Sequence, residues 1–93
     1  MSETIDNLIH EAAGILREAG AREVYVFGSA AKGEMRDHSD VDLAVSGLPP
    51  QVFFRAMSQA SAVLRRPLDL VDLDEDTPFV NYLKEEGDLK LVA

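Results

Sequence analysis

Three short apolar runs, separated by segments with helical spacing, constrain the fold of this chain most strongly. The runs occupy residues 23–27, 40–45 and 68–73. Apolar residues recur at helical spacing over 5–19 and again between 53 and 64. Strands that alternate with helices in this order predict an α/β or α+β domain, with a mixed sheet of three to four strands flanked by helices. The tail at 89–92 would supply a fourth strand at the edge of that sheet.

The residues that bound the helical segments support this division. Gly20 follows the first helix, whereas Thr77 and Pro78 suit the N-cap and first position of a helix that runs to Gly87. Gly14 lies inside the first helix, where we interpret it as a tolerated weak point rather than a site of close packing. The apolar stripe expected in the second helix consists of Phe53, Met57, Ala60 and Leu64.

Composition narrows the classes of function. The chain has 93 residues, 46% hydrophobic and 28% charged, which suits one core, so we expect a single domain over 1–93. Such a small domain has little stability to spare, which favours a partner subunit. The net charge of −8 disfavours binding to long nucleic acid. With no cysteine, no basic leader and no apolar run of membrane length, we expect a cytoplasmic protein that contacts no membrane.

Two aspartates stand at the start of the second run. Asp40 and Asp42 are two residues apart, so a strand would place both carboxylates on one face, with Cα atoms roughly 6.5 Å apart. Carboxylates this close repel each other unless a cation lies between them, and Mg²⁺ is the natural candidate because it binds carboxylate, water and phosphate oxygens. The alternative is a pair of solvated acids at a strand end. His38, in the preceding loop, is interpreted as solvated.

The first run ends in Gly28 and Ser29. Glycine lets the backbone approach a ligand closely, and the first amides of a helix are unpaired donors to which the serine hydroxyl adds another. This corner could therefore hold phosphate. The alternative is an ordinary turn from a strand into a helix, and neither this element nor the aspartate pair is persuasive without the other.

Together, the two elements resemble the signature of the nucleotidyltransferase superfamily that includes DNA polymerase beta, and of its short form, the minimal nucleotidyltransferases. In that superfamily a strand ends in Gly-Ser, a basic residue precedes a second glycine, and Ser-Asp-x-Asp-Leu begins the next strand. The corresponding elements here are Gly28-Ser29-Ala30-Ala31-Lys32-Gly33 and Ser39-Asp40-Val41-Asp42-Leu43. Lys32 stands where the family more often carries arginine, which keeps the charge and loses the bidentate fork. The resemblance extends over most of the chain and implies a polymerase-beta-like fold.

Family members also supply a third carboxylate from a later strand, and the third run offers Asp69 and Asp72. Their spacing of three places them on opposite faces of a strand, so only one can serve. Asp69 better matches the family pattern of an aspartate between apolar residues, and we favour it, with Asp72 as the alternative.

The resemblance implies transfer of a nucleoside monophosphate from a triphosphate to an acceptor hydroxyl, with pyrophosphate leaving. Two Mg²⁺ ions would stabilise the entering and leaving oxygens of an in-line displacement. Asp69 would also help to deprotonate the acceptor. The implied catalytic and metal-binding residues are Asp40, Asp42 and Asp69. The implied nucleotide-binding residues are Gly28, Ser29 and Lys32.

The acceptor is the remaining question, and nothing in the chain is left over for an acceptor-binding domain. Minimal members resemble one half of two-gene systems in which the nucleotidyltransferase is the antitoxin of a small helical HEPN ribonuclease toxin and attaches AMP from ATP to a toxin tyrosine. This is our leading hypothesis, with a hetero-oligomer of the two proteins. One alternative is neutralisation of the partner by complex formation without catalysis. A weaker alternative is a small-molecule (antibiotic) nucleotidyltransferase that needs a second chain.

Overall fold

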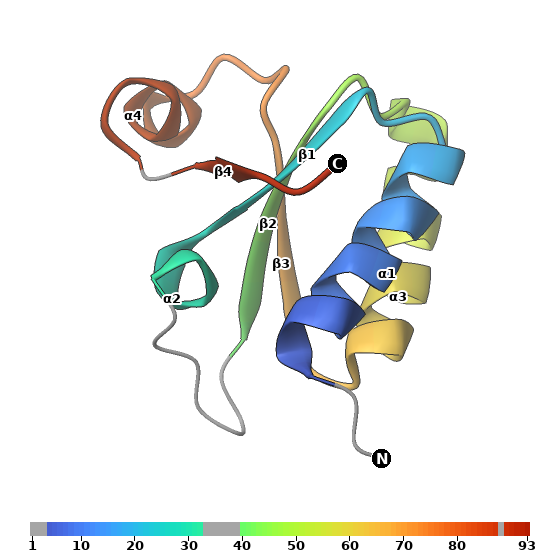
Figure 1. Cartoon of the computed structure of the whole chain (residues 1–93). Helices are drawn as coiled ribbons and strands as arrows, with labels where there is room; N and C mark the ends of the chain where they lie inside the picture. Colours follow the sequence, from blue (N-terminus) through green and yellow to red (C-terminus); the bar gives the residue numbers. More distant parts are fainter. Residues whose placement is uncertain (1–3, 33–39, 88) are drawn as a thin grey trace.

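One four-stranded sheet with helices on both sides forms the core of the protein (Figure 1). The computed structural model describes residues 4–32, 40–87 and 89–93, so His38 and the motif residues Gly33 and Ser39 lie outside the described part. The elements are α1 (Ile5–Glu18), β1 (Glu23–Phe27), α2 (Gly28–Ala31), β2 (Val41–Ser46), the 3₁₀ turn η1 (Pro50–Val52), α3 (Phe53–Leu64), β3 (Leu68–Asp72), α4 (Pro78–Glu86) and β4 (Lys90–Leu91). The small α+β domain with a mixed sheet is therefore confirmed.

The register of the sheet brings three strand ends together. The strand order is β3-β2-β1-β4, in which β1 runs antiparallel to β2 and β4, and β2 runs parallel to β3. Phe27 at the end of β1 pairs with Asp42 near the start of β2, and Asp42 pairs with Asp69 near the start of β3. The two predicted elements and the predicted third carboxylate consequently meet at one end of the sheet.

Two apolar clusters hold the helices on the sheet. The larger one joins α1 and α3 to one face, through alternate residues of β2, namely Val41, Leu43 and Val45. The smaller one contains Ala44 with Phe27, Leu73 and two residues of α4, Val80 and Leu83. Since side chains alternate along a strand, Asp42 belongs to the face that carries α4. Figure 1 shows α4 across the sheet from α1 and α3.

The packing of α3 differs in part from the sequence prediction. Ala56, Ala60 and Leu64 are buried, whereas Phe53 and Met57 of the predicted stripe are only partly buried, and the predicted stripe did not include Ala56. The face that packs on α1 uses small residues on both helices, since Ala12 and Ala13 of α1 are fully buried as well. Small side chains at this contact allow the two helix backbones to approach closely.

Most helix ends are where the sequence predicts them. The Thr4 side chain caps α1 by accepting a hydrogen bond of 3.2 Å from the Asn7 N–H, and the Thr77 side chain caps α4 by accepting one of 3.1 Å from the Val80 N–H. Pro78 is the first residue of α4, where its missing N–H costs nothing. Within residues 4–32, 40–87 and 89–93, no helix is long and apolar enough to span a membrane.

Replacing Gly14 with alanine is expected to stabilise the protein by about 0.5–1 kcal/mol. Gly14 is exposed on α1, and a Cβ there would meet nothing within 4 Å, so the substitution adds helix propensity without a clash. A thermal melt should show an increase in Tm of about 2–8 °C. Gly87→Ala is the opposing control, because its Cβ would lie 2.7 Å from the Leu83 carbonyl oxygen. If Gly14→Ala does not raise the Tm, the added methyl group meets a neighbouring segment of the chain.

Candidate active site

Asp42 and Asp69 form the centre of the site. They occupy paired positions on the parallel strands β2 and β3, close enough that the charge of Asp69 acts on Asp42. Both line a hollow of about 290 Å³, whose other walls are Phe27, Phe79 and two residues of β3, Leu70 and Val71. Two carboxylates therefore stand at the edge of an otherwise apolar hollow.

The environment of Asp42 opposes its negative charge. Burial raises the pKa of Asp42 above its usual value, and the charges of Asp69 and Asp40 and the hydrogen bond to Asp69 raise it further. Burial and neighbouring carboxylates both favour the protonated form of an acid, whereas a bound cation favours the ionised form. A cation bound at this site would therefore stabilise the ionised form of Asp42.

Gly28 touches Asp42 closely. Its φ of 69° lies in the left-handed region, and a Cβ at this position would overlap Asp42 Oδ2 and lie 3.2 Å from Asp42 Cγ. From the sequence, we expected Gly28 to let the backbone approach a ligand closely. The structure shows that the close approach is to the Asp42 carboxylate, so the glycine also sets the position of that side chain.

The other predicted residues are Asp40, Ser29 and Lys32, which belong to the segments next to this pair. Asp40 lies exposed just before β2, and its charge acts on Asp42. Ser29 is partly buried in the first turn of α2. Lys32, at the C-cap of α2, is exposed and lines a second hollow of about 230 Å³ together with Gly28. The structure thus brings the predicted residues to one end of the sheet.

The few carboxylates at this site suit Mg²⁺, which keeps water and phosphate among its ligands, better than a metal ion that is bound entirely by protein side chains. Within the described ranges 4–32, 40–87 and 89–93, no three histidine or acidic side chains are close enough together to hold a metal. The close carboxylates are the pair Asp42 and Asp69, with Asp40 nearby. Mg²⁺ is commonly held by one or two carboxylates, with water and substrate phosphate as its other ligands, so this arrangement fits it.

Asp69 and the alternative Asp72 lie on opposite faces of the sheet. Asp69 shares the face of Asp42, whereas Asp72 pairs with Val45, a residue of the cluster beneath α1 and α3. One carboxylate oxygen of Asp72 accepts a hydrogen bond of 2.9 Å from the Asp74 N–H, in the turn that follows β3. Asp69 is therefore the acid of β3 that adjoins Asp42.

Two aromatic residues at the site were not identified from the sequence. Phe79 and Tyr82 project from α4 and are 52% and 54% exposed. Phe79 meets Phe27 edge to face, with ring centroids 6.4 Å apart and an angle of 61° between the planes. The signal available in the sequence was their spacing of three on a helix whose buried residues are Val80 and Leu83, but only the fold shows that they face the carboxylates' end of the sheet.

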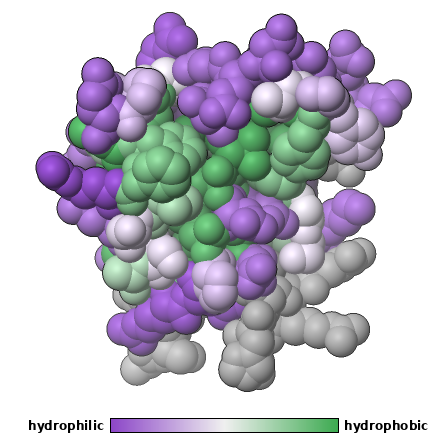
Figure 2. Space-filling view, turned by 180° about the vertical axis from the view of Figure 1, so that it is seen from behind, coloured by the Kyte–Doolittle hydropathy of each residue, from purple (hydrophilic) through white to green (hydrophobic). Residues whose placement is uncertain are grey.

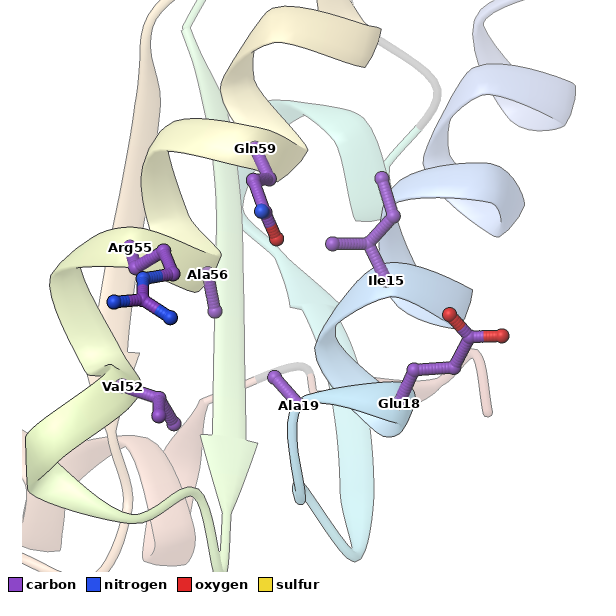
Figure 3. A pocket seen from close by; sticks show the side chains of 7 residues that line it. All are labelled: Ile15, Glu18, Ala19, Val52, Arg55, Ala56 and Gln59. Atoms are coloured by element: carbon purple, nitrogen blue, oxygen red, sulfur yellow. The ribbon is translucent and has the colours of Figure 1, made fainter.

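A further hollow of about 300 Å³ lies between α1 and α3 (Figure 3). Its charged lining residues are Glu18 and Arg55, and Ile15, Val52 and Ala56 supply apolar walls. It is on the face of the sheet opposite Asp42 and Asp69. We therefore do not assign the chemistry to it.

Comparison with known proteins identifies the family and the fold of this chain. The sequence model of the family described as polymerase beta, nucleotidyltransferase, matches residues 11–89. No curated protein matches the sequence. The fold is similar to one chain of a toxin–antitoxin crystal structure with AMP-PNP, at 23% identity and a TM-score of 0.70, covering 95% of this chain and 72% of that one.

Two more solved structures have the same fold. One is described only as a candidate minimal nucleotidyltransferase, with 26% identity and a TM-score of 0.70, covering 91% of this chain and 94% of that one. The other is a tri-AMPylated HEPN toxin in complex with its MNT antitoxin, from Shewanella oneidensis, with 18% identity and a TM-score of 0.69, covering 97% of this chain and 72% of the matched one. Because the family match spans most of the sequence, this chain belongs to the polymerase beta nucleotidyltransferase family.

Proposed function

We propose that this protein is a Mg²⁺-dependent nucleotidyltransferase that transfers AMP from ATP to a tyrosine hydroxyl of a HEPN ribonuclease toxin, and so acts as its antitoxin. The observation that carries the proposal is the pairing of Asp42 with Asp69 beside Gly28 at one end of the sheet. Family membership supports nucleotide transfer in general. The fold shared with chains of toxin–antitoxin structures supports the partner.

In this proposal each residue has a defined task. Asp42 and Asp69 would hold Mg²⁺, with Asp40 as a further carboxylate whose charge acts on Asp42, and the bound ion would offset the negative charge of the phosphates and of the attacking and leaving oxygens. Asp69 accepts the proton of the acceptor hydroxyl, whose oxygen bonds to the α-phosphorus of ATP. The bond from that phosphorus to the bridging oxygen breaks, and pyrophosphate leaves. Gly28 keeps Asp42 in place.

The phosphates of ATP are assigned to the corner after β1. Lys32 and Gly28 line the same hollow, so the ammonium charge of Lys32 can attract phosphate oxygens that lie against the Gly28 backbone. Ser29, in the next position along the chain, contributes a hydroxyl. Binding at this corner would point the α-phosphate towards Asp42 and Asp69, where the acceptor hydroxyl must enter.

The surface supports a protein acceptor. We propose that residues 1–93 act as a minimal nucleotidyltransferase domain, to which the partner supplies the acceptor and its binding wall. Seen from behind, hydrophobic side chains gather across the middle of the molecule, below a hydrophilic upper rim (Figure 2). Phe54 of α3 is 72% exposed, and Phe79 of α4 is exposed beside the carboxylates. Exposed apolar surface is a common mark of a contact with another protein.

The same surface favours a second candidate function, in which the protein neutralises its partner by complex formation alone. The two functions predict different results for one variant. If binding suffices, Asp42→Asn leaves neutralisation of the partner intact. If AMP transfer is required, the variant binds the partner and fails to neutralise it.

The Asp69→Asn variant is expected to transfer AMP about 10²–10⁴-fold more slowly than the wild type, because a carboxylate that takes a proton from the acceptor is replaced by an amide. Asp72→Asn is the matched control on the same strand, and its amide oxygen can still accept the hydrogen bond from the Asp74 N–H. Transfer is measured as the gain in mass of the co-expressed partner with Mg-ATP. Equal rates of AMP transfer for the wild type and Asp69→Asn would contradict the role given to Asp69. If only Asp72→Asn slows AMP transfer, Asp72 has that role instead.

A further inference from the structure

One side of α4 carries two aromatic side chains that are not buried in the core of this domain. The helix is attached to the sheet through Val80 and Leu83, which are 2% and 4% exposed. Phe79 and Tyr82 are three residues apart and therefore lie on the same side of the helix. More than half of each side chain is exposed, so burial in this domain does not explain the two rings.

The two rings line a hollow that adjoins the carboxylates. This hollow, of about 230 Å³, has Phe27, Phe79 and Tyr82 on its walls together with Gly28, Lys32 and Glu86. Phe27 and Phe79 also line the hollow that contains Asp42 and Asp69. Phe27 and Phe79, which meet edge to face, therefore form the wall that the two hollows share.

The hollow lined by the rings also contains Lys32 and Gly28, so a ligand there needs anionic groups next to a flat aromatic group, and its anionic part can extend towards Asp42 and Asp69 in the adjoining hollow. A nucleoside triphosphate has this composition, with phosphates for Lys32, Gly28 and the carboxylate-bound cation, and a base for the rings. Aromatic side chains stack on nucleobases through their faces, and each such contact contributes measurably to binding. We propose that Phe79 and Tyr82 of α4 form the base-binding platform of the nucleotide site.

The proposal rests on the proposed function, and two probes separate the failure of one from the failure of the other. ATP carries a base, whereas inorganic tripolyphosphate carries only the phosphate chain. Binding of each to the purified protein with Mg²⁺ is measured by calorimetry. Loss of the platform weakens binding of ATP and leaves binding of tripolyphosphate unchanged.

The variants are Phe79→Ala and Tyr82→Ala, and each is expected to weaken ATP binding roughly 5- to 100-fold. Tyr82→Ala guards against a folding defect, since Phe79 contacts Phe27 and its loss could disturb the sheet end. Phe54→Ala is the matched control. This exposed phenylalanine meets Phe53 edge to face at 5.5 Å on α3, and its loss should change neither affinity.

Three results would overturn the proposal in different ways. If the wild type binds neither probe, the nucleotide site and the proposed function fail together. If the wild type binds both probes and the two α4 variants bind ATP as tightly as it does, the function stands and the platform is refuted. If the two variants weaken the binding of ATP and of tripolyphosphate by the same factor, α4 supports the phosphate site and does not hold the base.

Discussion

Replacing Asp42 with asparagine is expected to slow AMP transfer by roughly 10³-fold or more while the domain stays folded, because loss of a metal-binding carboxylate removes several kcal/mol of transition-state stabilisation. Without metal, the variant should melt at a higher temperature than the wild type. Burial and two neighbouring carboxylates oppose the charge of Asp42, and the neutral amide removes that repulsion. The new amide group can also donate a hydrogen bond to Asp69.

The gain in stability depends on pH in a defined direction. The pKa of Asp42 in the folded protein is raised above the usual 3.8, so the folded state loses stability relative to the unfolded state as the pH rises through these two values. The difference in Tm between Asp42→Asn and wild type should be present at neutral pH and should vanish as the pH falls below about 3.8. Mg²⁺ should raise the Tm of the wild type more than that of the variant. A variant that melts far below the metal-free wild type at neutral pH would show that Asp42 is structural.

The second large effect is expected for Gly28→Ala, which should lower both stability and transfer. The φ of 69° costs an alanine about 1–2 kcal/mol, which corresponds to a decrease in Tm of about 5–15 °C. The added methyl group would also overlap Asp42 Oδ2 and displace the carboxylate. Because reacting groups must be held in position, we expect transfer to fall by about 10²-fold even where the protein is fully folded.

Gly47→Ala is the matched control for Gly28→Ala. Gly47 has a φ of 82° and lies after β2, at the opposite end of that strand from Asp42, where a Cβ would come within 2.6 Å of Arg22 Nε. This substitution carries a similar backbone cost and should leave transfer by the folded protein unchanged. Equal losses of transfer in the two variants would mean that Gly28 acts only through stability.

The helices, strands and paired carboxylates could be predicted because each follows from a local pattern. Apolar periodicity indicates the elements, and the odd spacing of Asp69 and Asp72 is enough to assign them to opposite faces of β3. The bounds of β1 match the prediction, since Gly28 ends the strand through its backbone conformation. To predict that Asp42 lies beside Asp69, one must also know that β2 and β3 are parallel neighbours joined by a helix.

Other features depend on contacts between distant segments and could not be read from local patterns. Met57 fits the helical stripe, but the close contact of α1 and α3 selects Ala56 for the buried position. The role of Gly28 against Asp42 depends on the antiparallel register of β1 and β2. The rings of α4 reach the site only because the turn after β3 returns the chain over that face of the sheet.

The measurement that tests the central claim most directly is the intact mass of the partner protein that co-purifies with this chain, before and after incubation with Mg-ATP. A parallel preparation carries Asp42→Asn. We predict that the partner gains one or more increments of the mass of AMP with the wild type and none with the variant. A tight complex whose partner keeps its mass at saturating Mg-ATP would contradict the proposed transfer and would leave neutralisation by binding.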